Sequence, residues 1–364
     1  MNLNENELKV LKILDEDPFV SQQYMADRLQ LSRPAVANLI SGLQDKGYIL
    51  GKPYLLRRDE YVTCIGSANI DYTLSLNEKM IYGTSNPVTS SFSFGGVVRN
   101  IAENLARLDH KVSLMALVGE DNMADLLLDD SRKIMETFAT DKVSLEKTGA
   151  YYSIIDKNGN MNVGFADMAI NFKMDRSWIL QHRKHLHLSN WLIADLNVQK
   201  TGIETLLEFS AQEQKQLILV GVSGPKMKNL PADLMGVHLL VCNLDESQAY
   251  FSTTNDNPAE LCEMWLKTGL KNIVVTAGKN GSWFGDSNTI KHQEALYVKN
   301  EDILDVTGAG DAFSAGVIHG MIQGQDISEC VKIGTVNASL TIKSPFSVNK
   351  NLSKKLIESE YIKL

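Results

Sequence analysis

Hydrophobic residues recur at helical spacing through the first 58 residues of the chain. The pattern, with Ser21 and Ser32 as plausible N-caps, predicts three helices, over Leu8–Leu14, Ser21–Leu29 and Ser32–Lys46. Gly47 would end the third helix, and Tyr48–Leu56 could form two short strands. Three helices followed by a small hairpin are typical of a winged helix-turn-helix, so we expect residues 1–58 to form one.

From Tyr61 onward, short apolar runs alternate with amphipathic stretches. The apolar runs predict strands at Val62–Gly66, Val112–Val118, Trp191–Ala194, Leu217–Val220, Leu239–Cys242 and Ile273–Thr276. The stretches between them predict helices such as Asn100–Leu108, Thr201–Ser210 and Pro258–Thr268. This alternation indicates an α/β fold for residues 61–364, with a central, mainly parallel sheet between helices. Residues 72–94 and 150–165 break the rhythm and predict a small antiparallel sheet beside it.

Composition excludes several classes of protein. The 364 residues are 44% hydrophobic and 22% charged, and the net charge is -8, so the chain is not basic throughout. No run of 18 apolar residues is present and the N-terminus lacks a secretory pattern, so no membrane association is expected. The four cysteines are far apart, which is typical of reduced thiols in a cytoplasmic protein.

The net charge hides a local basic segment. Residues 28–58 carry six basic groups and one acidic group, or +5. The predicted third helix offers Arg33, Asn38 and Gln44 for contacts with DNA, and the predicted wing offers Lys52 and Arg57. We expect DNA binding by a homodimer, since one such domain makes few phosphate contacts. A dimerisation or docking module that lost DNA binding is the alternative.

The strongest chemical motif is the small-residue segment Asp305–Gly316. Gly308, Ala309 and Gly310 lead into an apolar helix, and the free N–H groups at a helix start attract anions. Asp311 in the first turn could accept a proton from an attacking hydroxyl while those amides stabilise a transferring phosphoryl group. The alternative is an aspartate that only caps the helix.

A second motif precedes another predicted helix. Gly95 and Gly96 form a turn that exposes backbone groups to a polar ligand, and Asn100 follows in the first helical turn.

With both motifs in order, the chain from about Tyr61 resembles the ribokinase-like (PfkB) carbohydrate kinases. The resemblance implies a three-layer fold with a β-sheet lid, and the transfer of phosphate from ATP with Mg²⁺. It implies Asp311 as general base with Gly308, Ala309 and Gly310 as anion hole, and a sugar site made of Asn69, Asp71, Gly95, Gly96, Asn100 and Asn197. It also implies a nucleotide site at Asn243, Thr276, Gly278 and Thr335, Mg²⁺ held through water by Glu246, and possible binding of K⁺ at Asp305. Lys226 is expected near the ATP phosphates, although Gly221–Lys226 departs from the family pattern there.

Within that family, Gly66–Asp71, Ser85–Pro87 and Ala166–Asn171 look like segments of pseudouridine kinases. The expected reaction is therefore phosphorylation of the 5′-hydroxyl of pseudouridine, with Asp167 accepting the extra N–H of the base. Another sugar or nucleoside kinase, or a transcription regulator that senses a nucleoside with a kinase fold, is the alternative. If Asp167 has no such role, it merely caps a lid turn.

Overall fold

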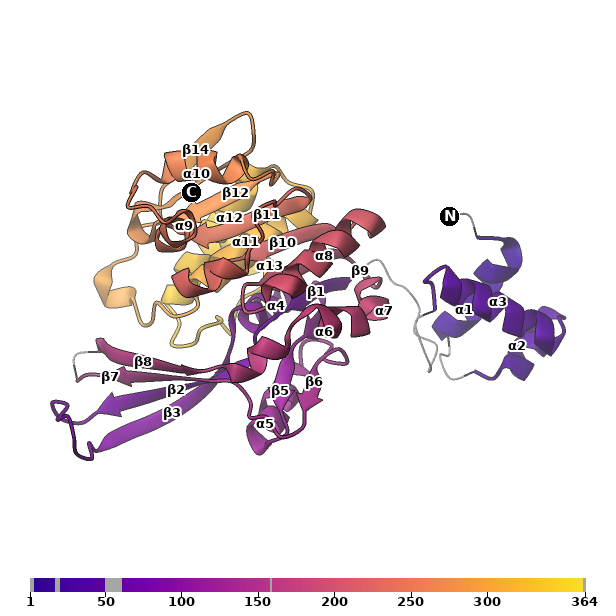
Figure 1. The fold of residues 1–364 in the computed structure, drawn as a ribbon, viewed down its shortest axis with the longest axis horizontal. Coiled ribbons are helices and arrows are strands. Elements are labelled where there is room, and N and C mark those ends of the chain that lie inside the picture. The colour runs from indigo at the N-terminus through magenta and orange to yellow at the C-terminus, as the bar shows by residue number, and fades with distance from the viewer. Residues whose placement is uncertain (1–2, 17–19, 50–60, 158, 363–364) are drawn as a thin grey trace. The chain divides into compact units, whose positions relative to one another are not determined.

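The computed structural model describes residues 3–16, 20–49, 61–157 and 159–362 (Figure 1). Contacts divide the chain into two compact units. One contains Met1–Tyr61 together with Gln181–Asn190, and the other contains Val62–Leu180 and Trp191–Leu364.

Three helices form the core of the first unit: α1 (Glu5–Glu16), α2 (Gln22–Leu29) and α3 (Arg33–Asp45). The two predicted serine caps are present. Ser21 Oγ accepts from Tyr24 N at 3.1 Å, and Ser32 Oγ accepts from Ala35 N at 3.3 Å. The helices bury an apolar core that includes Val10, Leu14, Met25, Val36, Ile40 and Leu43. The strands predicted within Tyr48–Leu56 fall almost entirely outside the described residues.

An eight-stranded sheet forms the centre of the second unit (Figure 1). Its order is β14-β13-β12-β11-β10-β9-β1-β4, where the strands are β1 (Tyr61–Ile65), β4 (Lys111–Met115), β9 (Ser189–Asp195), β10 (Gln216–Val220), β11 (Val237–Asn243), β12 (Ile273–Thr276), β13 (Ser282–Gly285) and β14 (Ile290–Gln293). Strands β9 to β12 pair in parallel, and β13 and β14 are antiparallel. The predicted, mainly parallel sheet is confirmed.

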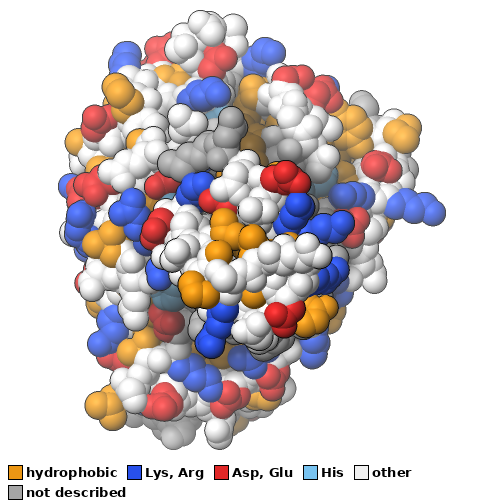
Figure 2. All heavy atoms as spheres, turned by 90° about the vertical axis from the view of Figure 1, so that its right-hand side faces the viewer, with side chains coloured by type: hydrophobic (Ala, Val, Ile, Leu, Met, Phe, Trp, Pro, Cys, Tyr) orange, Lys and Arg blue, Asp and Glu red, His pale blue; other side chains and the backbone are white. Residues whose placement is uncertain are grey.

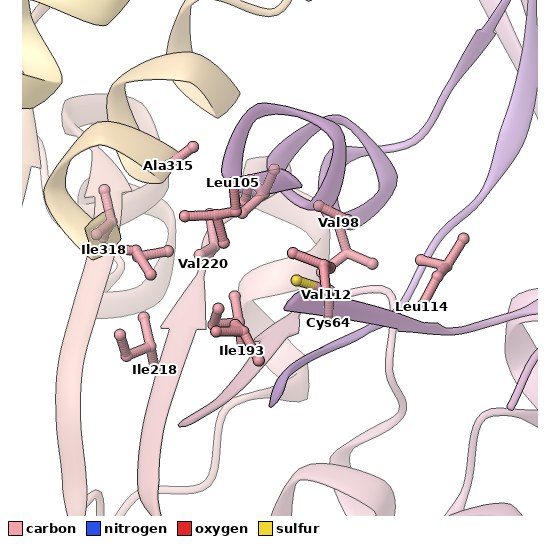
Figure 3. Close-up of a cluster of buried hydrophobic side chains, with 14 of the residues drawn as sticks. Cys64, Val98, Leu105, Val112, Leu114, Ile193, Ile218, Val220, Ala315 and Ile318 are labelled. Atoms are coloured by element: carbon pink, nitrogen blue, oxygen red, sulfur yellow. The ribbon is translucent and has the colours of Figure 1, made fainter. Parts of the chain in front are cut away.

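Helices cover both faces of this sheet, which is why its strands are continuous apolar runs. On one face lie α4 (Val97–Arg107), α11 (Ala309–Ile322) and α12 (Ile327–Ile342). Figure 3 shows Leu105 of α4 and Ile318 of α11 near Val220 of β10, and Val98 of α4 near Cys64 of β1 and Val112 of β4. The intervening residues of β10 are equally buried on the other face, where α8 (Lys200–Glu213) packs on β10 and α10 (Pro258–Leu266) on β12.

A second, four-stranded sheet projects from the large one (Figure 1). Its order is β3-β2-β7-β8, with β2 (Asn69–Leu76), β3 (Val88–Gly95), β7 (Ala150–Ile155) and β8 (Met161–Asp167). The predicted small sheet is confirmed, but its expected antiparallel pairing is wrong for the central pair. Strands β2 and β7 run parallel, because a long stretch of chain separates them.

The predicted strand Val112–Val118 is instead two strands. β4 ends at Met115, and β5 (Leu117–Gly119) pairs with β6 (Asp141–Val143) in a separate sheet. The remaining elements are α5 (Asn122–Ser131), α6 (Arg176–Gln181), α7 (Arg183–Leu186), α9 (Leu244–Phe251) and α13 (Lys354–Tyr361), with the 3₁₀ helices η1 (Ala169–Lys173), η2 (Gly224–Asn229), η3 (Gly278–Asn280) and η4 (Asn300–Asp302).

Basic and acidic side chains are interspersed over the face drawn in Figure 2. Within the described part of the chain, no helix combines the length and the apolar character needed to cross a membrane.

Candidate active site

The turn before α11 has the geometry expected of an anion site. Gly308 has φ +79°, and a Cβ there would lie 2.1 Å from Ser347 O, so only glycine fits. Gly310 is exposed, and a Cβ built on it meets nothing within 4 Å. Because the first amides of a helix have no acceptor within it, the start of the 14-residue α11 presents N–H donors such as that of Gly310, whereas Ala309 N donates to Val306 O at 3.3 Å.

Asp311, in the first turn of α11, joins the two motifs predicted from the sequence. Asn100 Nδ2 donates to Asp311 Oδ2 at 2.8 Å, although the residues are 211 positions apart. The other amide atom, Asn100 Oδ1, is buried and has no partner, so it is available to a ligand hydroxyl.

Burial raises the pKa of Asp311 to about 7, against an ordinary value of 3.8. The carboxylates of Asp71, Asp195 and Glu246 raise this pKa further, while the hydrogen bond from Asn100 opposes the rise. A carboxyl group that titrates near neutral pH is suited to accept a proton from a hydroxyl.

The beginning of the lid strand β2 carries a second carboxylate, Asp71. Asn69 Nδ2 donates to Asp71 Oδ1 at 2.6 Å, and a Cβ on Gly95 would lie 1.9 Å from Asp71 Oδ2. Gly96 has φ +103° and packs its Cα against Ser67 O. Burial raises the pKa of Asp71 to about 6. The paired glycines therefore leave room for Asp71 beside the start of α4.

Asn243 and Glu246 form a reciprocal capping box at the start of α9. Asn243 Oδ1 accepts from Glu246 N at 2.8 Å, and Glu246 Oε2 accepts from Asn243 N at 2.9 Å. Gly221 allows this, because a Cβ there would lie 2.1 Å from Glu246 Oε2. The buried Glu246 has a raised pKa, chiefly from desolvation.

The donor set fits Mg²⁺ held through water. The cap needs only Oε2 of Glu246, which leaves Oε1 for a hydrated ion, and Mg²⁺ prefers to keep several waters. Among the residues that the structure describes, no three His, Cys, Asp or Glu side chains gather closely enough to hold a metal by themselves.

The remaining expected nucleotide residues are spread over several elements. Thr276 ends β12 beside Asn243 in the sheet, and Gly278 follows with φ +54°. Lys226 in η2 is half-buried, and its pKa is lowered by desolvation, against the attraction of Asp195. Thr335 is buried in α12 and its hydroxyl donates to Val331 O at 2.9 Å, so that donor is already engaged.

Asp305 has a local role in the loop before α11. Its Oδ1 accepts from Thr307 N at 2.8 Å, so this carboxylate caps the loop.

Asp167 does not join Asp71. In the lid, Asp167 pairs with Ala150 and Ala150 with Ile70, whereas Asp71 pairs with Tyr151 in the next row. Directly paired residues share a face and successive ones alternate, so the two carboxylates belong to opposite faces. The register therefore separates Asp167 from Asp71, and a contact of Asp167 with a bound base stays a prediction.

Met168, the residue after β8, lies near Asn69 of the proposed sugar site. Its Sδ would lie 2.9 Å from a Cβ on Gly149, which in turn would be 3.5 Å from Asn69 Cβ. Asn197 is buried just after β9, and its N–H donates to Asp195 Oδ1 at 2.9 Å.

Sequence reasoning missed Asp195, which is fully buried at the carboxyl end of β9, an inner strand of the large sheet. The available signal was a charged residue directly after the apolar run Leu192–Ala194. In parallel sheets that edge is where ligands bind.

In the first unit, the side chains of Arg33, Asn38 and Gln44 on α3 are exposed, whereas Val36, Ile40 and Leu43 are buried. Lys46 contributes less to the basic segment than its charge suggests, because Nζ pairs with Glu7 at 2.7 Å. Lys52 and Arg57 lie outside the described residues.

The fold and this site define a ribokinase-like kinase architecture, a central sheet with a β lid and an anion turn at a helix start. Residues 59–354 match the family model for pfkB family carbohydrate kinases, and the chain belongs to this family. Residues 3–49 match the model for winged helix-turn-helix DNA-binding domains.

Two curated relatives from Escherichia coli K12 cover most of the chain. A pseudouridine kinase is 29% identical over 304 residues, which are 82% of this chain and 95% of that protein. The uncharacterized sugar kinase YeiI is 26% identical over 357 residues, or 96% of this chain and 97% of its own. The latter match therefore includes most of the N-terminal unit.

Solved structures share the fold. A carbohydrate kinase from Agrobacterium tumefaciens superposes with a TM-score of 0.72 at 24% identity, covering 83% of this chain and 97% of its own. Ribokinase from Thermotoga maritima gives 0.69 at 23% identity, with coverage of 84% and 99%.

Proposed function

We propose that this chain is an ATP- and Mg²⁺-dependent kinase that phosphorylates the 5′-hydroxyl of a nucleoside, with pseudouridine as the first candidate. The observation that carries the proposal is the 2.8 Å contact between Asn100 and Asp311, a base with a pKa of about 7. It joins the substrate-facing start of α4 to the anion turn of α11. Pseudouridine is favoured over other acceptors by the similarity to the pseudouridine kinase of Escherichia coli.

In the proposed reaction, the acceptor oxygen forms a bond to the γ-phosphorus of ATP while the bond to the β–γ bridging oxygen breaks and ADP leaves. Asp311 takes the hydroxyl proton, and the amides of residues 308–310 stabilise the charge on the phosphoryl oxygens. Asp71 holds the acceptor hydroxyls with Asn69, Gly95, Gly96 and Asn197 nearby.

The nucleotide would bind between Thr276, Gly278 and the start of α11, with Lys226 near its phosphates. Glu246 would hold Mg²⁺ through water by its free Oε1, while Asn243 fixes the carboxylate by the capping box. When bound there, Mg²⁺ neutralises charge on the transferred group. The hydrogen bond of Asp305 to Thr307 N gives no specific support for a K⁺ site. Comparing turnover in K⁺ and in Na⁺ tests whether activity depends on K⁺.

Turnover on a panel of acceptors tests the proposed function. Full-length protein is assayed with ATP and pseudouridine, uridine, ribose, adenosine or fructose 6-phosphate. We expect the largest kcat/KM with pseudouridine, and we expect Asp311→Asn to abolish most of that activity. A different best acceptor would leave a kinase but reject pseudouridine. No turnover on any of them, with nucleoside-dependent binding to DNA, would instead identify a sensing regulator.

The match of residues 3–49 to DNA-binding domains supports a second function for the same chain. We propose that α3 reads DNA with Arg33, Asn38 and Gln44, and that two copies of the chain bind one operator. Selection of bound genomic fragments, followed by titration at several salt concentrations, tests this. Arg33→Ala should weaken binding and reduce the salt slope by about one if Arg33 contacts a phosphate. If no fragment binds tightly, or if Arg33→Ala binds as well as the wild type, the proposed reading of DNA by α3 is rejected. Light scattering tests separately whether the chain forms a dimer.

A further inference from the structure

Asp195 is a buried carboxylate that the proposed reaction does not use. It ends β9, the strand beside β1 in the large sheet, and is 0% exposed. Burying a charge is costly unless hydrogen bonds satisfy it, so the partners of Asp195 show what its charge stabilises.

Four hydrogen bonds reach this carboxylate from three segments. Asp195 Oδ2 accepts from Ser67 N at 3.0 Å, from Ser67 Oγ at 2.8 Å and from Val98 N at 3.2 Å. Asp195 Oδ1 accepts from Asn197 N at 2.9 Å. Ser67 begins the loop into Asp71, and Val98 lies in the first turn of α4, two residues before Asn100.

Glycines on both sides make this approach possible. Gly66 has φ +146°, and a Cβ there would lie 2.3 Å from Asp195 Oδ1. A Cβ on Gly96 would lie 2.4 Å from Ser67 O, and Arg99 N donates to that same oxygen at 3.3 Å. The loop after β1 and the start of α4 are therefore packed on each other and fastened to Asp195.

We propose that Asp195 is a positioning residue, which fixes Asp71 and Asn100 relative to each other by holding the backbone of Ser67 and Val98. The inference rests on the proposed function, in which Asp71 and Asn100 hold the acceptor. Its charge also acts at a distance, because it raises the pKa of Asp311 and attracts Lys226.

The test uses Asp195→Asn in the full chain. Asparagine keeps the size, but its NH₂ group cannot accept from the amides that face it. We expect the KM for the acceptor to rise at least about tenfold, as for the loss of hydrogen bonds to a buried charged group, while the KM for ATP changes less than about twofold. The acid limb of kcat/KM should move to lower pH, because a negative charge near Asp311 is gone.

Glu103→Gln is the matched control. Glu103 is also a buried carboxylate on α4, but its partners are Arg99, Arg107 and Lys350. It should lower the Tm while leaving both KM values and the pH profile unchanged. If Asp195→Asn changed only the Tm, as the control does, Asp195 would be merely structural and the proposal would be overturned.

Two further measurements keep the outcome decisive. Ser67→Ala removes one of the four hydrogen bonds and should raise the KM for the acceptor a few-fold. An unchanged KM would count against the proposal, even if Asp195→Asn does not fold. Hydrogen exchange needs no substrate. Asp195→Asn should speed exchange of the Ser67 amide and Glu103→Gln should not. A wild type without turnover on the acceptor panel would reject the proposed function, while the exchange result would still decide the role of Asp195.

Discussion

Replacing Asp311 by asparagine should make the protein inactive and more stable at the same time. The pKa of this carboxyl rises from 3.8 to about 7, mainly because it is buried. At 1.36 kcal/mol for each pH unit, ionising it at pH 8 costs about 4 kcal/mol more in the folded chain than in the unfolded one. Water at the half-buried group reduces that cost, so we expect a gain of about 1–3 kcal/mol from Asp311→Asn at pH 8.

The pH dependence of this gain follows from the sign of the shift. Well below the unfolded pKa of 3.8 both states hold the proton, so the variant has no advantage there and only a small one at pH 4. The advantage grows as pH rises through the interval from 3.8 to about 7 and is complete above it. Activity changes in the opposite sense. The kcat/KM of the wild type should rise with pH and level off above about 7, and the variant should lose at least about 10²-fold in kcat.

Thermal unfolding at pH 8 and pH 4, together with a pH–rate profile, measures these effects. A gain of 1 kcal/mol should raise the Tm by about 2–4 °C for a domain of this size. Asp326→Asn is the control, since that exposed carboxylate caps α12 and its pKa is lowered, so its loss should give no gain. A lower Tm for Asp311→Asn at pH 8, or an acid limb near pH 4 in the wild type, would refute a buried base at this position.

Three further predictions concern the turn before α11, the N-terminal unit and the thiols. Gly308→Ala should lower both kcat and the Tm, because its Cβ would meet Ser347 O at 2.1 Å; an unchanged Tm would show that the turn can adapt. Ser32→Ala should destabilise the N-terminal unit by about 1 kcal/mol through loss of the α3 cap, measured by circular dichroism during heating, with no change in kinase activity. The four buried cysteines are free, so dithiothreitol should leave the Tm unchanged, and a reductant-dependent shift would contradict this.

The order of strands and helices in the large unit could be predicted because its apolar runs are periodic. The lid could be located but not fully paired. The parallel pair β2–β7 joins strands separated by β3, α4, β4, β5, α5 and β6, and no local pattern specifies such a long-range register. The same register places Asp167 and Asp71 on opposite faces of the lid, because successive residues of a strand point to opposite faces.

The site residues divide in a similar way. Gly308 and Gly96 could be recognised because their backbone conformations suit glycine, which is visible in the sequence. Asp195 could not, because its role depends on Ser67 and Val98, which lie 128 and 97 positions away. Asn243 and Glu246 were found through a resemblance, but their three-residue spacing is also that of a capping box.

The contact between α4 and α11 explains how two distant motifs act as one site. Asn104 Oδ1 accepts from Asn337 Nδ2, and Asn337 Nδ2 also donates to Ala312 O, which ties α4 and α12 to the first turn of α11. One turn earlier on α4, Asn100 reaches Asp311. These buried amides have few alternative partners, so they fix the spacing of the two helix starts. A shift of α4 would therefore change the position of Asn100, which binds the acceptor in the proposed reaction, relative to Asp311, which deprotonates it. The hydrogen bonds of Asp195 to the start of α4 therefore affect the base as well as the acceptor.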